Sequence, residues 1–106
     1  MSDTAGSFPT ITEGDIHAHL RARMAQRGVT LEEIRHTLKN GWPATDCRPG
    51  TRGQVLVFSY RAEWEGRFYG EKEVTVYYKV KDGQLILLTV KARYGEGFLR
   101  GEPHED

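Results

Sequence analysis

The chain has 106 residues, a length that suits one domain and leaves no room for a second. Its single cysteine, Cys47, excludes an internal disulfide, and its longest apolar run, LILLTV, is far shorter than the roughly 20 residues of a membrane-spanning helix. The N-terminal sequence MSDTAGSFPT lacks the basic and apolar regions of a secretory signal, so we expect a soluble, cytoplasmic protein that does not bind membranes.

The formal net charge is zero, but the charges are segregated along the chain. All 15 Lys and Arg residues lie within residues 16–100 together with nine of the 15 acids, so this segment carries a charge of +6. The other six acids lie near the two ends. Acidic ends either promote solubility or cover a basic surface and weaken its non-specific binding to nucleic acid, and the sequence does not separate these roles.

The first half of the chain predicts a helical hairpin. Residues 1–11 are typical of a flexible leader, and Thr12 with Asp15 forms a capping pair before IHAHLRARMAQR, which predicts a helix that ends at Gly28. Its apolar stripe, which we expect to face a sheet, consists of Ile16, Leu20 and Met24.

A second helix follows after only a few residues. Thr30 and Glu33 form a capping box, LEEIRHTLK has helical periodicity, and Asn40-Gly41 ends it. So short a connection requires the two helices to pack as neighbours. The stretch WPATDCRPGTRG then predicts a loop.

The second half predicts an antiparallel sheet. VLVFSY is typical of an inner strand, RAEWEGRFYGEKE predicts a linker of which part can itself pair as a strand, and Asp82-Gly83 predicts a two-residue hairpin turn. The predicted fold is α+β, with the helical hairpin packed on a three- to four-stranded antiparallel sheet. It spans residues 12–100 as one domain, and residues 101–106 form an acidic tail.

The register of the final hairpin can be counted from its turn. If Lys81 pairs with Gln84, then Tyr78 faces Leu87 and the alternation of a strand puts Thr89, Lys91 and Arg93 on one face. The same count puts Val80, Leu85 and Leu87 on that face too, and predicts that the helices cover the opposite one, with Ile86, Leu88, Val90, Ala92 and Tyr94. Single Lys and Arg residues at a strand end are usually only solvated. Their clustering here predicts a functional site.

The first helix supplies a second polar group. His19, Arg23 and Arg27 recur at four-residue spacing, next to the buried stripe. A histidine there can transfer protons near neutral pH and arginines can grip phosphate, although a solvated basic helix face has the same pattern. We also expect Arg27, Arg48, Arg52 and Lys79 to contact nucleic acid.

These residues include the types that metal-independent RNA cleavage requires: a base, cations and an acid. Tyr94 falls on the face opposite Lys91 unless the strand bends at Gly95, so it ranks last as the acid. The pair His17 and His19 does not predict a metal site, because positions two apart on a helix point in different directions. We therefore expect no metal and no other cofactor.

The stretch RARMAQRGVTLEEIRHTL resembles the opening of a small bacterial family of uncharacterised domains, whose pattern is matched by His19, Arg23, Met24, Arg27 and Gly28. The ending VYYKVKDGQLILLTVKARYGEGF is similar to the final hairpin of RelE-type and BrnT-type toxins, and the resemblance covers about residues 16–98. It implies a RelE-like fold, metal-independent endoribonuclease activity and an antitoxin-like protein partner. The implied substrate is RNA, including ribosome-bound mRNA, and the implied catalytic residues are His19, Arg23, Thr89, Lys91 and Arg93.

Three functions remain open at this point. The first is a toxin-type endoribonuclease. The second uses the same basic surface to hold RNA, DNA or an acidic protein without cleaving it. The third is a partner protein that docks through an exposed sheet edge, either to another chain or to a second copy as a homodimer.

Overall fold

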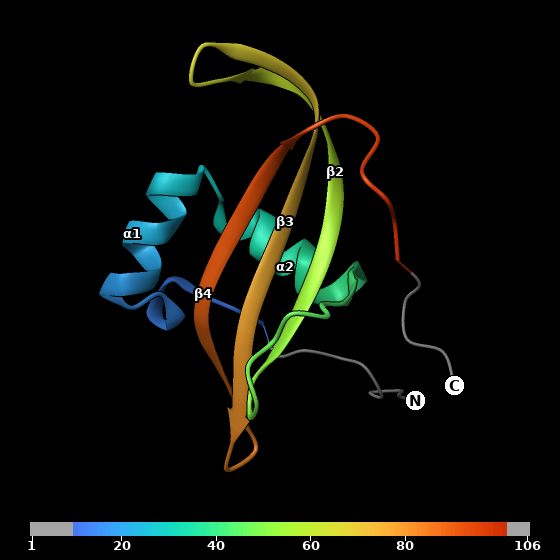
Figure 1. Ribbon diagram of the computed structural model, residues 1–106. Helices are drawn as coiled ribbons and strands as arrows, with labels where there is room; N and C mark the ends of the chain where they lie inside the picture. Colours follow the sequence, from blue (N-terminus) through green and yellow to red (C-terminus); the bar gives the residue numbers. More distant parts are fainter. Residues whose placement is uncertain (1–9, 102–106) are drawn as a thin grey trace.

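Two helices pack on a four-stranded antiparallel sheet in the computed structural model, which describes residues 10–101 (Figure 1). The strands lie in the sheet in their chain order, α1 packs along β4, and α2 lies across β2 and β3. The predicted α+β class is confirmed. The elements are the 3-10 helix η1 (Glu13–Asp15), the helices α1 (Ala18–Arg27) and α2 (Leu31–Asn40), and the strands β1 (Trp42–Pro43), β2 (Arg52–Trp64), β3 (Arg67–Lys81) and β4 (Gln84–Gly95).

The start of the first helix differs from the prediction. Thr12 and Asp15 do form a capping box, but it stands at the start of η1 and not at the start of α1. The chain is extended at Ile16, and α1 begins after His17, whose Nδ1 accepts a hydrogen bond from the Leu20 N–H at 3.3 Å. Because Nδ1 accepts, the ring carries its proton on Nε2 and donates it to the Leu87 carbonyl oxygen at 3.0 Å.

The connection between the helices and the start of α2 follow the prediction. Gly28 ends α1 in the left-handed conformation, with a φ of 73°. Glu33 and Thr30 form the predicted capping box, in which the Thr30 N–H donates to Glu33 Oε1 at 3.0 Å and the Glu33 N–H donates to Thr30 Oγ1 at 3.1 Å. Both helices therefore begin and end on local signals.

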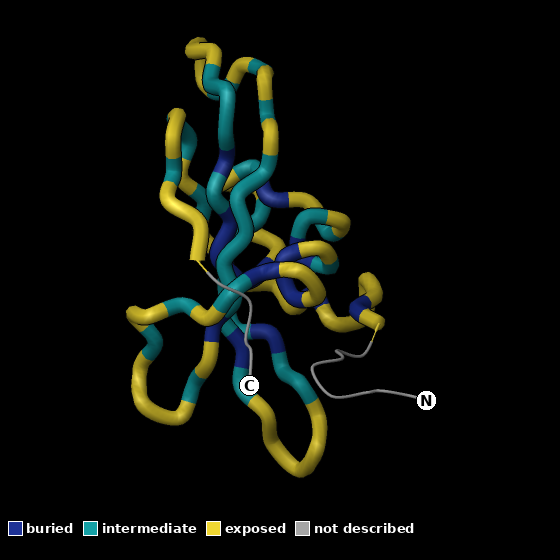
Figure 2. Tube along the Cα trace, turned by 90° about the vertical axis from the view of Figure 1, so that its right-hand side faces the viewer, coloured by how far each residue is buried: buried dark blue, intermediate teal, exposed yellow. Residues whose placement is uncertain are grey.

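The hydrophobic core lies between the helices and the sheet, where buried positions follow one another along the inner part of the molecule (Figure 2). Ile11, which the sequence placed in the leader, is 3% exposed and accepts a hydrogen bond at its carbonyl from Arg35 Nε at 2.8 Å. The rest of the leader, residues 1–9, and residues 102–106 of the acidic tail lie outside the described residues. The core consists of Ile11, Ile16, Leu20, Val29, Ile34, Leu38, Val74, Val76, Tyr78, Leu87 and Val90.

A β-bulge in β4 corrects the predicted register of the last hairpin. The count from the turn holds through the pair Tyr78–Leu87, but the next pair is Tyr77–Thr89, so Leu88 is an extra residue. The inward-facing positions of β4 therefore change from odd numbers to even ones at the bulge. Leu85 and Leu87 face the helices together with Val90 and Ala92, not the side of Thr89 as predicted.

The predicted linker is also a paired structure. Residues 61–73 complete β2 and begin β3, and the two strands are joined at the turn Glu65-Gly66. A second irregularity lies between Ser59 and Ala62, where Arg61 has a φ of 49°. There the β2–β3 hairpin bends away from the rest of the sheet (Figure 1).

The face opposite the helices carries no helix, but the loop between β1 and β2 and residues 96–101 lie against parts of it. This segment leaves β4 at one end of the sheet and runs back beside β2 (Figure 1). The Phe98 N–H donates to Glu71 Oε1 at 3.0 Å, and Arg100 donates to Glu71 Oε2 at 2.8 Å.

No helix within residues 10–101 is long and apolar enough to cross a membrane.

Candidate functional site

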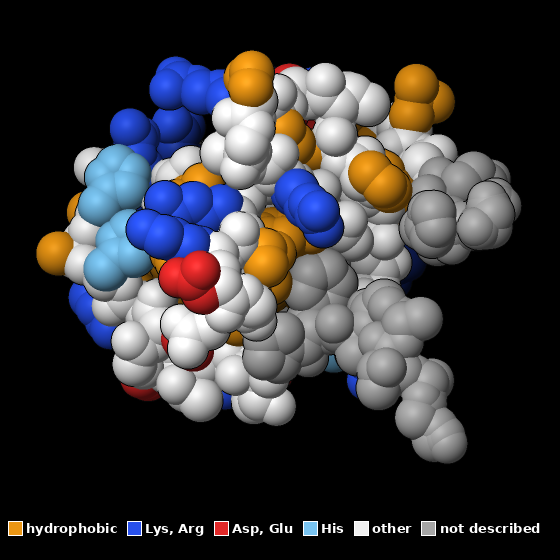
Figure 3. Space-filling view, turned by 90° about the horizontal axis from the view of Figure 1, so that it is seen from below, with side chains coloured by type: hydrophobic (Ala, Val, Ile, Leu, Met, Phe, Trp, Pro, Cys, Tyr) orange, Lys and Arg blue, Asp and Glu red, His pale blue; other side chains and the backbone are white. Residues whose placement is uncertain are grey.

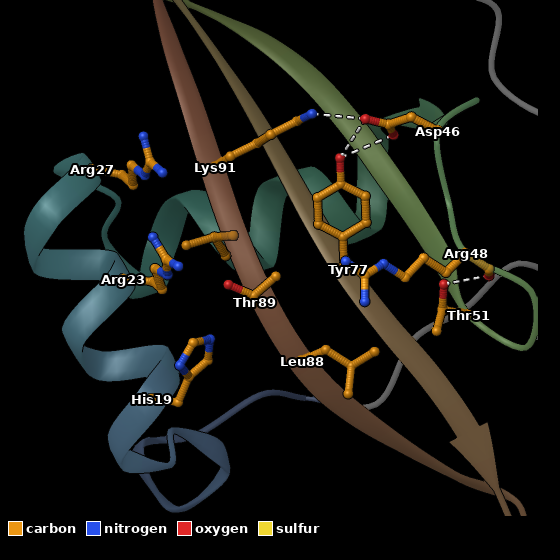
Figure 4. Close-up of a pocket in the computed structure, with 11 residues that line it drawn as sticks. His19, Arg23, Arg27, Asp46, Arg48, Thr51, Tyr77, Leu88, Thr89 and Lys91 are labelled. Carbon is orange, nitrogen blue, oxygen red and sulfur yellow. Dashed lines mark hydrogen bonds and ion pairs between the residues drawn. The ribbon is translucent and has the colours of Figure 1, made fainter.

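A groove of about 520 Å³ lies between α1 and the open face of the sheet, and we call it the helix groove (Figure 4). Side chains from α1, from the loop between β1 and β2, and from β3 and β4 all border it. Its lining consists of His19, Arg23, Arg27, Asp46, Arg48, Thr51, Tyr77, Leu88, Thr89, Val90 and Lys91.

The α1 wall is formed by the three residues that the sequence singled out. Leu20 is fully buried and Met24 is half-buried against the core, so the helix is turned with its next row of side chains over the groove. That row contains His19, Arg23 and Arg27, which line the groove in succession (Figure 4). The spacing of the sequence was therefore sufficient to find this wall.

The β4 wall depends on the bulge. Thr89 lies opposite Tyr77 and Lys91 lies opposite Thr75, and all four side chains belong to the open face. The extra residue, Leu88, also lines the groove, because a bulge turns two successive side chains toward the same side. Leu88 was predicted to lie under the helices, and the unpredicted bulge is the physical reason for that error.

A cluster of three residues occupies the centre of the open face. Lys91 Nζ lies 2.7 Å from Asp46 Oδ2, and the Tyr77 hydroxyl lies 2.9 Å from each oxygen of the same carboxylate. The ammonium group is also 5.5 Å from the centre of the Tyr77 ring. These contacts join the β1–β2 loop to β3 and β4 (Figure 4).

The protonation of this cluster follows from its contacts. The hydrogen bond from Lys91, and then that from Tyr77, lowers the pKa of the Asp46 carboxyl group. The same hydrogen bond with Asp46 raises the pKa of Lys91, and burial raises the pKa of the Tyr77 phenol. At neutral pH the carboxylate and the ammonium group are charged, and the phenol keeps its proton.

The loop that brings Asp46 to the sheet is held by its own hydrogen bonds. Thr51 donates through its hydroxyl and its N–H to the Arg48 carbonyl oxygen, at 2.7 and 3.0 Å. Gly53 lets the loop pass close to the sheet, because a Cβ atom there would lie 3.1 Å from both Cys47 Sγ and Tyr77 Cδ1. Burial raises the pKa of the Cys47 thiol, so it keeps its proton and is a poor nucleophile.

Three of the predicted site residues lie outside the helix groove. Arg93 is on the face of Lys91, but it forms a two-pronged ion pair with Glu73 at 2.8 and 3.2 Å. Arg52 pairs with Tyr78, which places it on the side of the helices, and Lys79 lies beyond the groove toward the hairpin turn. The structure thus brings together His19, Arg23, Arg27, Arg48, Thr89 and Lys91.

Tyr94 has a structural role on the other side of the sheet. Its hydroxyl donates to the Arg27 carbonyl oxygen at 2.6 Å, and its ring stacks on Trp64 at 5.0 Å between centroids. Burial raises the pKa of this phenol well above its ordinary value. Tyr94 therefore supports the end of α1 and is not available to a ligand in the groove.

The charge of the helix groove favours an anion. Three arginines, one lysine and one histidine border it against a single carboxylate, Asp46, which Lys91 already neutralises. Seen from below, the molecule has Lys, Arg and His side chains gathered on one part of its surface (Figure 3). No group of three or more His, Cys, Asp or Glu side chains within residues 10–101 is arranged to hold a metal ion.

Sequence reasoning missed five residues of the groove, one of which, Val90, belongs to the core and only borders the groove. Tyr77 was missed because the predicted register was wrong by one residue: counting from the turn paired Thr89 with Val76, whereas Thr89 pairs with Tyr77. Asp46 and Thr51 lie in an irregular loop whose path no local pattern reveals. Leu88 was assigned to the covered face for the reason given above.

Comparisons with protein-family models, with curated proteins and with solved structures find no match to this chain.

Proposed function

We propose that the helix groove binds single-stranded RNA and cleaves it without a metal ion. The observation that carries this proposal is the convergence of a histidine, three arginines, a lysine and a tyrosine from α1, the β1–β2 loop, β3 and β4 around one groove. Arginine and lysine bind phosphate, and histidine and tyrosine transfer or donate protons. The similarity of the final hairpin to those of RelE-type and BrnT-type toxins supports the same activity.

The proposed reaction follows from the chemistry of RNA. His19 accepts the proton of a 2′-hydroxyl, whose oxygen attacks the adjacent phosphorus while the bond to the 5′ oxygen breaks. Arg23 and Lys91 stabilise the charge on the phosphorane. The Tyr77 hydroxyl, which donates to Asp46 in the free protein and keeps its proton at neutral pH, donates that proton to the leaving 5′ oxygen. The products are a 2′,3′-cyclic phosphate and a 5′-hydroxyl.

The test is incubation of the purified protein with end-labelled single-stranded RNA in EDTA, with the products resolved on a sequencing gel. The wild type should cleave, whereas His19→Ala and Lys91→Ala should each cleave at least about 100-fold more slowly. Lys81→Ala, which removes the same charge as Lys91→Ala at an exposed position by the hairpin turn, is the matched control. A second arm with mRNA on purified ribosomes covers ribosome-dependent cleavage. Intact RNA in both arms would overturn the proposal.

One observation favours a second function, binding without cleavage. Lys91, the one lysine among the residues that line the helix groove, is already paired with Asp46 at 2.7 Å. A groove in that state can still hold RNA, DNA or an acidic protein through its arginines. Salt-sensitive binding by wild-type protein, with no products in either arm of the cleavage experiment, would identify this function. An antitoxin-like partner would occupy the same basic groove in either case.

A further inference from the structure

A second groove, of about 670 Å³, adjoins the helix groove on the open face of the sheet. We call it the tryptophan groove. Residues of β1 and residues 99–101 of the returning segment border it, together with Glu73, Thr75 and Arg93 on the open face of the sheet. Asp46 and Lys91 line both grooves, so the Lys91–Asp46 pair lies at their junction.

The walls of the tryptophan groove are apolar and aromatic. Trp42 is held on one side by the pairing of β1 with Val55 of β2, and on the other by Gly101, where a Cβ atom would lie 2.3 Å from the indole Cδ1. Leu99 is 89% exposed, so its side chain does not contribute to the core and is accessible to a ligand. An indole and a leucine at the edges of one groove form a surface on which a flat nucleobase can stack.

The cations that line the tryptophan groove form ion pairs with acidic residues. Arg93 is paired with Glu73, and Arg100 is paired with Glu71 at 2.8 Å. Lys91 and Arg93 are two residues apart on a strand, which separates their backbone positions by roughly 6.8 Å. That distance is comparable to the separation of neighbouring phosphates in one RNA strand.

We infer that the tryptophan groove binds the nucleotide adjacent to the cleaved phosphate, with its base against Trp42 and Leu99 and its phosphate at Arg93. This inference rests on the proposed function of the helix groove. It assigns the path of the RNA, which runs from α1 across Lys91 toward β1. It also gives Arg93 the role of a binding residue at the adjacent phosphate instead of a catalytic one.

The test uses Trp42 as its own reporter. Trp64, the other tryptophan, stacks on Tyr94, so Trp64→Phe leaves Trp42 as the only source of indole fluorescence. This variant is titrated with a labelled 2′-O-methyl pentanucleotide, which cannot be cleaved, and both the anisotropy of the label and the Trp42 fluorescence are recorded. Binding should quench Trp42. The same oligonucleotide with one abasic site, moved stepwise along the strand, should lose the quenching at one position.

Two further variants measure the energetic role of the groove without touching its structural tryptophan. Leu99→Ala and Arg93→Ala should each weaken binding of the pentanucleotide at least about fivefold. Val80→Ala, at another exposed apolar position beside the hairpin turn, is the control for Leu99→Ala and should bind as the wild type does. A mononucleotide should bind all of these proteins equally, because it fills only the helix groove.

The outcomes separate the two proposals. If the oligonucleotide binds but Trp42 fluorescence and the two variants are unaffected, the tryptophan groove is not part of the RNA path, while the proposed function stands. If the oligonucleotide does not bind to the wild type, this inference fails, whereas the proposed function is decided separately by the two arms of the cleavage experiment. Both proposals are supported if the oligonucleotide quenches Trp42, if an abasic site at one position of the strand abolishes this quenching, and if Leu99→Ala binds the oligonucleotide more weakly.

Discussion

Asp46 is the residue on which the state of the helix groove depends. Its carboxylate accepts from Lys91 and from Tyr77, two groups that would otherwise both be free to donate to a phosphate oxygen. If the groove binds RNA as proposed, the carboxylate competes with a phosphate group for the same two donors. In the described part of the chain it is also the one acid that lines the groove.

We predict that Asp46→Asn increases the affinity of the protein for single-stranded RNA by about two- to fivefold, because it removes an anion that competes with phosphate for Lys91 and Tyr77. The expected gain is small because the ion pair that is lost is exposed and therefore weak. The measurement is a binding titration with labelled RNA at low salt. Asp82→Asn is the matched control: it removes one negative charge, and Asn-Gly suits the hairpin turn as well as Asp-Gly does. Equal gains in both variants would show that net charge alone is responsible.

The same residue predicts a dependence on pH. The folded-state pKa of Asp46 is lowered from 3.8, chiefly by its hydrogen bond from Lys91, so the carboxylate stays charged at and above pH 5. The difference in affinity between the wild type and Asp46→Asn should therefore be constant from pH 5 to pH 8. It should disappear only as the pH falls through the lowered pKa. A difference that vanishes between pH 5 and pH 8 would contradict this assignment of the competing anion.

The individual residues of the site differ in how far the sequence predicts them. The four-residue spacing of His19, Arg23 and Arg27 fixes their common face, since a helix has one period. A strand has a period of two, so one extra residue at Leu88 exchanges the two faces for everything counted beyond it. Thr89 and Lys91 keep their common face because they lie on the same side of the bulge.

At the scale of the elements, Lys72 joins both helices to the sheet. It is 1% exposed on β3, and its Nζ lies 2.7 Å from Glu33 Oε1 and also donates to the Gly28 carbonyl oxygen. The rings of Tyr60 and Tyr94 each lie 5.4 Å from the ammonium group. The cation is therefore fully surrounded by partners on α2, on the turn between the helices and on two strands.

We predict that Lys72→Met lowers the free energy of unfolding by about 3 kcal/mol, because breaking one half of a buried ion pair leaves the other half without compensation. Urea denaturation followed by circular dichroism measures the change. Lys79→Met, on the same strand but half-exposed, is the control and should cost less than about 0.5 kcal/mol. A loss of similar size in both variants would show that the Glu33 contact contributes little.

The elements themselves were predicted in proportion to their local signals. The capping box at Thr30, the left-handed Gly28 and the turn at Asp82-Gly83 each determine a boundary within a few residues, and all three lie where the sequence placed them. The β2–β3 hairpin has no such signal, because its turn Glu65-Gly66 lies in a stretch without alternation. Lys72 could not be predicted as buried, since the groups that accept hydrogen bonds from its ammonium group, on Glu33 and Gly28, lie at least 39 residues away in the sequence.

At the scale of the whole molecule, the arrangement of charge matters more than its sum. The net charge is zero, yet Arg23, Arg27, Arg48 and Lys91 all border one groove. Binding through a few clustered cations differs from binding through a uniformly basic surface. The first releases a small, fixed number of counterions from the RNA, and single substitutions in the groove change that number.

We predict that the logarithm of the RNA association constant falls with the logarithm of salt concentration with a slope of roughly −2 to −3, the value for three or four phosphate contacts on a single strand. The measurement is a binding titration repeated from 50 to 300 mM KCl, with salt as the only variable. Arg23→Ala should make the slope less steep by about 0.7, because it removes one contact. Lys81→Ala removes the same charge at the far hairpin turn and should leave the slope unchanged. If both substitutions changed the slope equally, the RNA would be bound by the general charge of the surface. The helix groove would then not be the RNA-binding site.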